Sequence, residues 1–195
     1  MSVVVVNHVT LDGVMQAPAG PEEDTRDGFA HGGWSFPYGD QVMGEFMGKR
    51  MSHGAGAMLF GRWTYESLRR AWTDRTDDNP FTDVLNKVQK YVASCTLEEP
   101  LPWMNSTLLK GDAADAVAEL KSHSDQNLTI LGSATLVQSL MRRDLVDEFV
   151  LTIHPLILGS GRRLFADHGS YASFELTESV PTTTGVLIAT YQRRS

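Results

Sequence analysis

The sequence predicts an α/β fold with a mostly parallel central sheet, antiparallel strands at its C-terminal end and helices on both faces. Residues 3–9 are almost continuously β-branched, which is typical of a strand that is covered on both faces. Up to about residue 143, short apolar runs alternate with segments of helical periodicity. From residue 148 onward, strand-like segments follow one another with only turns between them, which favours an antiparallel edge.

Each predicted element depends on a periodicity and on a boundary signal. Helices are expected at 41–53, 63–71, 80–89, 114–123 and 134–143, the first, third and fourth after the capping residues Asp40, Asn79 and Asp112. Strands are expected at 3–9, 57–60, 90–94, 128–131, 148–158, 174–179 and 186–193. Met43, Met47 and Met51 share one face of the first helix, so we predict that this face packs into the core.

Composition excludes several classes of protein. The 195 residues contain 17 Lys and Arg against 24 Asp and Glu, which argues against binding along a nucleic-acid backbone. No apolar run approaches the 18 or more residues of a membrane span. Cys95 is the single cysteine, and the first residues lack the features of a signal peptide, so we expect a cytoplasmic protein without an internal disulfide. No break in composition divides residues 1–195, so a single domain is expected.

Residues 16–39 form a polar stretch, rich in Gly and Pro, that is too long for an ordinary connection. Its aromatic residues Phe29, Trp34, Phe36 and Tyr38 are unusual for a linker. The segment is therefore predicted to be a lid over an active site.

Several common signatures are absent from the sequence. Gly56 and Gly61 have P-loop spacing, but Arg62-Trp63 stands where Lys-Ser/Thr is required. Neither G-x-G-x-x-G nor G-x-S-x-G occurs after a predicted strand. The six histidines have no metal-binding spacing, so no metal site is predicted.

Two strand–glycine–helix junctions remain, LFGRWTYESL around Gly61 and ILGSATLVQSL around Gly132. The first turn of a helix presents unpaired N–H groups and a partial positive charge, and glycine lets the backbone approach a ligand closely. Two such ends that converge could hold a pyrophosphate, although glycine at a turn is also common for purely structural reasons.

Six blocks of sequence, in order, resemble the dihydrofolate reductase-like family, most closely its branch with the reductase (RibD C-terminal) domain of bacterial riboflavin biosynthesis. The blocks are VTLDG, LFGRWTYESL, KYVASCTL with WMNSTLLKGD, ILGSATLVQSL, LVDEFVLTIHPLILGSGRRLF and a final apolar strand. The resemblance covers residues 3–193 apart from the predicted lid and an acidic loop. It implies a three-layer fold that binds NADPH across the carboxyl ends of its strands.

By this resemblance the cofactor-binding residues fall into three groups. The first group, Gly61, Arg62 and Thr64, would contact the phosphates of the cofactor. The second, Ser94, Cys95 and Thr96, would lie beside the adenosine 2′-phosphate. The third, Gly132, Ser133, Ala134 and Thr135, would bind the pyrophosphate. Arg62 would select NADPH over NADH, because a guanidinium forms charge-assisted hydrogen bonds to a phosphate monoester. Relatives often have a basic residue at the position of Cys95, so the preference for NADPH is expected to be shallow.

Two further assignments concern the substrate. Asp12 is our candidate catalytic residue, to orient the substrate or donate a proton, although Asp12-Gly13 is also a common turn. Trp34 is the candidate to stack on a flat heterocycle; alternatively it fixes the loop to the core. GSGRRLF at 159–165 is interpreted as a tight turn with solvated arginines, with a substrate-phosphate site as the alternative.

These features predict an NADPH-dependent reductase that transfers hydride to a C=N or C=O bond of a small heterocyclic substrate, similar to 5-amino-6-(5-phosphoribosylamino)uracil reductase. A true dihydrofolate reductase is the nearest alternative, and a non-catalytic NADPH-binding module is the alternative from another class. The resemblance also implies a homodimer built on the C-terminal strands.

Overall fold

The computed structural model describes residues 1–52, 56–75, 79–165 and 167–194. Its strands are β1 (Val3–Thr10), β2 (Ala57–Gly61), β3 (Lys90–Ala93), β4 (Ser106–Leu109), β5 (Leu128–Leu131), β6 (Glu148–His154), β7 (Phe174–Pro181) and β8 (Leu187–Arg193). Its α-helices are α1 (Gln41–Ser52), α2 (Arg62–Trp72), α3 (Pro80–Lys87), α4 (Ala113–His123) and α5 (Ala134–Met141).

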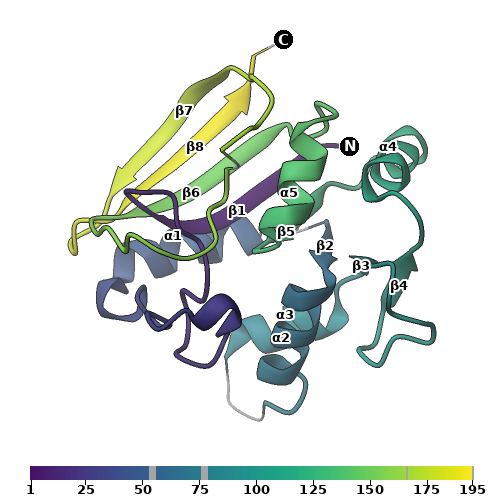
Figure 1. Cartoon of the computed structure of the whole chain (residues 1–195), viewed down its shortest axis with the longest axis horizontal. Coiled ribbons are helices and arrows are strands. Elements are labelled where there is room, and N and C mark those ends of the chain that lie inside the picture. The colour runs from purple at the N-terminus through teal and green to yellow at the C-terminus, as the bar shows by residue number, and fades with distance from the viewer. Residues whose placement is uncertain (53–55, 76–78, 166, 195) are drawn as a thin grey trace.

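The strands form one eight-stranded sheet in the order β4-β3-β2-β5-β1-β6-β8-β7 (Figure 1). Every adjacent pair from β4 to β6 in this order is parallel. β8 pairs antiparallel with both β6 and β7. The predicted fold class is confirmed, including the antiparallel strands at the C-terminal end. β1 lies between β5 and β6, so its carboxyl end opens near the middle of the sheet.

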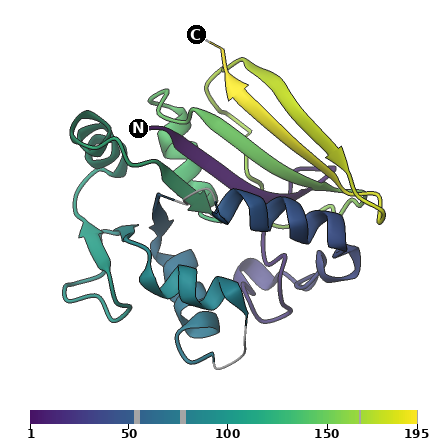
Figure 2. The same ribbon diagram turned by 180° about the vertical axis from the view of Figure 1, so that it is seen from behind.

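Helices cover both faces of the sheet. On one face, Val5 of β1 and Leu59 of β2 pack with Val117 of α4 and Val137 of α5. On the other face, Met58 and Phe60 of β2 join a cluster with residues of α2 and α3, and α1 crosses this same face (Figure 2). The two-residue period of a strand therefore divides β2 between two separate cores, whereas Val4 and Val6 on the second face of β1 line a cavity.

The predicted capping residues are confirmed at α1, α3 and α4. Asp40 accepts a hydrogen bond from the Met43 N–H at 2.9 Å. The Asn79 side chain accepts a hydrogen bond from the Phe81 N–H, and Asp112 accepts from the Ala114 and Asp115 N–H groups. The predicted end of α1 at His53 lies outside the described residues. β4 was not predicted, and β6 ends at His154 rather than continuing to residue 158, because Pro155 follows and cannot donate to the sheet.

The prediction for the methionine face of α1 is wrong in part. Among residues 41–50 none is buried, and Phe46 and Met47 line a cavity instead of a closed core. The side chain of Met51 is not among those that the structure describes. α1 therefore stands over the sheet and leaves space beneath it.

The segment 16–39 is folded back onto the protein. It contains two short 3₁₀ helices, Arg26–Gly28 and Phe36–Tyr38. Ala17, Phe29 and Trp34 are buried in a small apolar cluster with Val14. We call residues 16–39 the lid.

Candidate functional site

A cavity of about 1580 Å³ opens along the carboxyl ends of β2, β3 and β5 and extends beneath α1. A single drug-sized ligand usually occupies a pocket of about 300–1,000 Å³. The cavity is therefore large enough for two ligands side by side. Its walls come from the sheet, α1, α2, the start of α5 and the first part of the lid.

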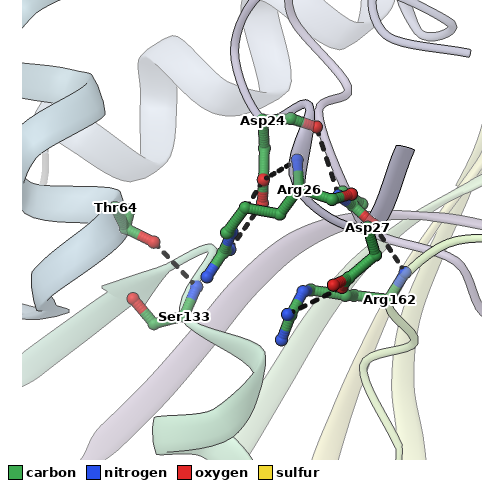
Figure 3. Close-up of polar contacts among 7 residues, drawn as sticks. Asp24, Arg26, Asp27, Thr64, Ser133 and Arg162 are labelled. Atoms are coloured by element: carbon green, nitrogen blue, oxygen red, sulfur yellow. Dashed lines mark hydrogen bonds and ion pairs between the residues drawn. The ribbon is translucent and has the colours of Figure 1, made fainter. Parts of the chain in front are cut away.

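The starts of α2 and α5 meet at this cavity. The Gly61 N–H donates to the Ser133 Oγ at 3.0 Å, and the Ser133 N–H donates to the Thr64 Oγ1 at 3.0 Å. Figure 3 shows the second of these hydrogen bonds. The two glycine junctions, 71 residues apart in the sequence, are thus fixed to each other by reciprocal hydrogen bonds.

Gly132 has a conformational reason to be glycine. Its φ is +58°, and a Cβ added there would lie 2.9 Å from the Thr64 Oγ1. The buried Asn7 side chain holds both backbone groups of Gly132, accepting from its N–H at 2.7 Å and donating to its carbonyl at 3.1 Å. A side chain at position 132 would therefore break the contact between the junctions.

Neither α2 nor α5 has a side-chain N-cap hydrogen bond. The first-turn N–H groups of a helix have no acceptor within the helix, and they carry part of its positive dipole. Two helix starts that are joined and uncapped at one cavity wall form a favourable environment for a bridged phosphate anion.

Arg62, the first residue of α2, lies beside the turn at Ser94. Its Nη1 donates to the Thr96 Oγ1 at 2.7 Å, and its Nε pairs with Glu66 at 2.9 Å. The Ser94 Oγ accepts from the N–H groups of Thr96 and Leu97 and so closes this turn. About half of the Arg62 side chain is exposed, so the guanidinium is oriented but accessible.

Most of the cofactor residues named from the sequence come together at the cavity. Those that line it are Gly61, Arg62, Thr64, Ser94, Cys95, Gly132, Ser133, Ala134 and Thr135, whereas Thr96 joins them through Arg62. Cys95 is exposed.

Asp12 lies outside this group of residues. Its carboxylate accepts hydrogen bonds from the Thr10 Oγ1 at 2.5 Å and the Gly159 N–H at 2.9 Å, and it does not line the cavity. The Thr10 hydroxyl and then these backbone hydrogen bonds lower the pKa of Asp12, so the group stays ionised. Asp12 therefore ties a turn to the 158–159 segment, and its expected catalytic role stays a prediction.

Trp34 also lies away from the cavity. It is buried, its Nε1 donates to the Gln16 carbonyl at 2.7 Å, and its ring packs edge-on against His154. The residue fixes the lid to the sheet, which agrees with the alternative that the sequence left open, and its stacking on a substrate stays a prediction.

His8 is a cavity residue that the sequence analysis missed. Its Nδ1 lies 2.9 Å from the Nε2 of His154, which is fully buried. Burial lowers the pKa of His8 to about 4, and burial together with the charge of His8 lowers the pKa of His154 to about 4. The signal was present as Asn7-His8, two polar residues within a run of valines, because a buried polar pair in a central strand needs partners.

Arg26 was missed as well, whereas Arg162 belongs to the GSGRRLF segment for which a phosphate site was the alternative interpretation. Both line the cavity, from the lid and from the GSGRRLF turn respectively. Arg162 pairs with Asp27 of the lid at 2.8 Å, while its Nε is buried and has no hydrogen-bond partner among the described residues. The turn predicted at 159–165 therefore contributes one of its two arginines to the cavity wall.

The described residues contain no group of three or more His, Cys, Asp or Glu side chains arranged to hold a metal ion. Within the same residues, no helix has the length and apolar character needed to cross a membrane.

The chain is similar to known proteins over nearly its whole length. The model of the RibD C-terminal domain matches residues 1–188. The chain belongs to the RibD C-terminal domain family. Among curated proteins, the uncharacterized protein YyaP of Bacillus subtilis (strain 168) is 26% identical over 191 residues, which are 94% of this chain and 90% of YyaP. YwjB of the same organism, also uncharacterized, is 41% identical over 59 residues, 30% of this chain and 34% of YwjB.

Solved structures share the fold of this RibD C-terminal domain. A putative riboflavin biosynthesis protein from Shewanella sp. PV-4 has a TM-score of 0.70 at 23% identity, with both chains fully covered. A pyrimidine reductase-like protein from Corynebacterium diphtheriae has a TM-score of 0.66 at 13% identity, over 100% of this chain and 92% of the other. A dihydrofolate reductase from Enterococcus faecalis, complexed with NADP(H), has a TM-score of 0.61 at 13% identity, over 100% and 97%. The fold is dihydrofolate reductase-like.

The charge around the cavity of this RibD C-terminal domain differs from that of the whole chain. The chain has a net charge of −7, yet its cavity is lined by more basic than acidic side chains. The basic residues are Arg26, Lys49, Arg50, Arg62, Arg142 and Arg162, and the acidic ones are Glu23, Asp24, Asp112 and Glu178. A basic lining, uncapped helix starts and an unpartnered Arg162 Nε fit a dinucleotide with several phosphates.

Proposed function

We propose that the protein is an NADPH-dependent reductase that transfers hydride to a C=N or C=O bond of a small heterocyclic substrate. The observation that carries the proposal is the pairing of the α2 and α5 starts through Gly61, Ser133 and Thr64. Next to it, Arg62 and the Ser94 turn offer donors for a phosphate monoester. NADPH combines a pyrophosphate with such a monoester, the adenosine 2′-phosphate.

The strand order supports one direction for the cofactor. The 2′-phosphate belongs at the end of β3, the pyrophosphate at the ends of β2 and β5, and the nicotinamide therefore towards β1. Three strand spacings separate β3 from β1, a span of roughly 14 Å. His8 is the β1 residue that lines the cavity near this end.

The bound cofactor would supply the hydride to the carbon of the substrate's C=N or C=O bond. The nitrogen or oxygen of that bond must then receive a proton. We assign to His8 the hydrogen bond to that nitrogen or oxygen atom. Its Nδ1 faces His154, which leaves Nε2 for a ligand, and burial favours the neutral form of both rings. A neutral imidazole can take up a proton from water at its free nitrogen and deliver it to that atom, which is the role assigned to the His8 Nε2. His154 orients the ring and is not part of a relay, because its own Nδ1 is buried without a partner among the described residues.

The space beneath α1 is our proposed substrate compartment. Phe46 and Met47 supply an apolar wall, Lys49 adds a basic side chain, and Arg50 is paired with Glu148. None of these α1 lining residues is a carboxylate, the group that would recognise a pterin ring. The lack of a carboxylate on α1 therefore favours another flat heterocycle over dihydrofolate, whereas charge does not discriminate, since the glutamate tail of dihydrofolate is also anionic.

The test is a calorimetric titration of wild type and Arg62→Ala with NADPH and NADH. Loss of a charge-assisted hydrogen bond of about 1.5–3 kcal/mol should weaken NADPH binding about 10- to 150-fold. NADH lacks the 2′-phosphate and should bind equally to both proteins. Equal weakening of the two cofactors contradicts the role of Arg62, and no binding of either to wild type contradicts the proposed function.

A substrate screen then separates the alternatives. Pterins and ribosylaminopyrimidine phosphates are added with NADPH, and loss of the reduced-nicotinamide absorbance is recorded. Turnover of dihydrofolate would identify a true dihydrofolate reductase, and tight NADPH binding without any turnover would favour the non-catalytic module. With a substrate identified, His8→Asn should lower kcat about 100-fold, as expected for lost general acid–base catalysis, and leave NADPH affinity unchanged.

The homodimer and the cytoplasmic location stay predictions. Leu176 on the edge strand β7 and Tyr171 just before it are exposed, which supports an association through the C-terminal strands. Size-exclusion chromatography with light scattering tests the dimer directly.

A further inference from the structure

The lid places one arginine, Arg26, against the start of α2. Its guanidinium lies 4.2 Å from the centre of the Trp63 ring, the second residue of that helix. A guanidinium stacked on an aromatic face is held in orientation while its edges stay available for hydrogen bonds. Arg26 therefore reaches from the lid to the site where α2 and α5 meet.

Asp24 fixes the orientation of Arg26. Its carboxylate accepts from the Arg26 Nε at 2.8 Å and from the Nη2 at 2.5 Å, and the residue is buried. Burial alone would raise the pKa of Asp24, but the hydrogen bonds and the charge of Arg26 outweigh it and lower this pKa. Two of the five guanidinium N–H groups are thus used, and the others have no acceptor in the described part of the chain.

The lid backbone around Arg26 is also fixed. The buried Gln16 side chain donates to the carbonyls of Asp24 and Arg26 and accepts from the Arg162 N–H at 2.9 Å. Both the side chain and the backbone of Arg26 are therefore held in place at the cavity wall.

Figure 3 shows the Arg26 side chain directed from the lid towards the Thr64–Ser133 hydrogen bond, with Arg162 on the same side. All four residues line the one cavity. An anion at the uncapped helix starts would have backbone N–H groups on its sheet side and these two arginines on its lid side.

We propose that Arg26 binds the pyrophosphate of the dinucleotide from the lid side, with Asp24 as its positioning residue. The inference rests on the proposed function and extends it, because it adds a cofactor contact from the lid. The pyrophosphate is common to NADPH and NADH, so Arg26 contributes affinity for both, in contrast to Arg62, which selects between them.

The test is equilibrium binding of NADPH, NADH and adenosine 2′-phosphate to wild type, Arg26→Gln and Arg62→Ala. Arg26→Gln should weaken both dinucleotides about tenfold, the value of one charge-assisted hydrogen bond at a partly exposed site, and leave adenosine 2′-phosphate unchanged. Arg62→Ala should weaken NADPH and adenosine 2′-phosphate and leave NADH unchanged. Arg26→Lys, which keeps the charge and loses the planar fork, should fall between Arg26→Gln and wild type.

Two controls keep the outcome specific. Arg143→Gln removes an arginine of an exposed pair with Asp115, which is outside the cavity lining, and should bind every ligand as wild type does. Trp63→Leu removes the ring on which Arg26 stacks but keeps the guanidinium. If Arg26 only latches the lid to Trp63, this variant weakens the dinucleotides as much as Arg26→Gln, and the inference is wrong.

The failure of the inference can be told from that of the proposed function. Unchanged dinucleotide affinity in Arg26→Gln, together with a selective loss of NADPH in Arg62→Ala, overturns the role of Arg26 alone. Wild type that binds neither dinucleotide overturns both. Thermal unfolding of each variant confirms that the affinities are measured on folded protein.

Discussion

The starts of α3 and α4 are closed by Asn79 and Asp112, whereas the starts of α2 and α5 have no side-chain cap. The same contrast extends to buried charges. The Nζ of the fully buried Lys90, the first residue of β3, donates to three backbone carbonyls at 2.8–3.2 Å. In contrast, the Arg162 Nε at the cavity has no partner among the described residues. The Lys90 ammonium group, which is not part of the cavity lining, is thus satisfied within the chain. The starts of α2 and α5 and the Arg162 Nε lack an internal side-chain partner in the described part of the chain, as expected for groups that meet a ligand.

The strongest test of this contrast is Gly132→Val. Its side chain would meet Thr64 at a positive φ, so we expect NADPH affinity to fall by at least about 100-fold and the protein to lose about 2 kcal/mol of stability. Titration calorimetry and thermal unfolding measure the two effects. Gly159→Ala has a similar φ, +73°, with no atom within 4 Å of the added Cβ, so it should be strained but bind normally. Equal losses of affinity in both variants would contradict a specific role for the junction.

Gly61→Asp turns an uncapped helix start into a capped one. The space permits it, since a Cβ at Gly61 would be in ordinary contact with Ser133 at 3.7 Å. We expect helix capping to add about 1 kcal/mol of stability and the new carboxylate to weaken NADPH binding about 30-fold, through competition and repulsion at the anion site. Gly61→Asn, the neutral cap, should lose much less affinity. Unchanged binding in Gly61→Asp would show that no anion binds at this helix start.

The histidine pair gives a test by pH. His8 and His154 have pKa values of about 4 in the folded protein, against an ordinary value of 6.5. Between pH 6.5 and 4 the unfolded chain takes up protons that the folded protein does not, so stability should fall with pH across this window, by about 2 kcal/mol per histidine between pH 7 and pH 5, or about 4 kcal/mol for the pair. Urea unfolding at pH 7 and pH 5 measures it. His154→Gln should flatten this dependence, whereas His123→Gln, at an exposed position, should retain it.

The smallest expected effect is that of Asp112→Ala. Loss of the cap of α4 should cost about 1 kcal/mol of stability, because two N–H groups lose their acceptor. NADPH affinity should change less than twofold. A large loss of affinity with little change in stability would place Asp112 among the ligand contacts and reverse the contrast between the two pairs of helices.

The features that were predicted from the sequence depend on local signals. Asn79 and Asp112 cap helices two or three residues away, and the glycine junctions are marked by their own strand and helix patterns. The missed features depend on distant partners. Asn7 contacts Gly132, 125 residues later, and His8 contacts His154, 146 residues later. Asp12 and Trp34 were assigned by their position after a strand and within a lid, yet the orientation of each is set by a hydrogen bond that only the folded chain contains.

Helix α1 packs loosely over the sheet, and this affects how the sequence of the protein can change in evolution. Since no residue of the described 41–50 segment is buried, replacing its side chains creates small cavities and costs little folding free energy. The junctions at Gly61 and Gly132, in contrast, are hydrogen-bonded to each other at the ends of the central strands, and Gly132 has no room for a side chain. Under the proposed function, new substrate preferences can therefore arise by exchanging side chains on one helix while the residues around the cofactor site stay unchanged.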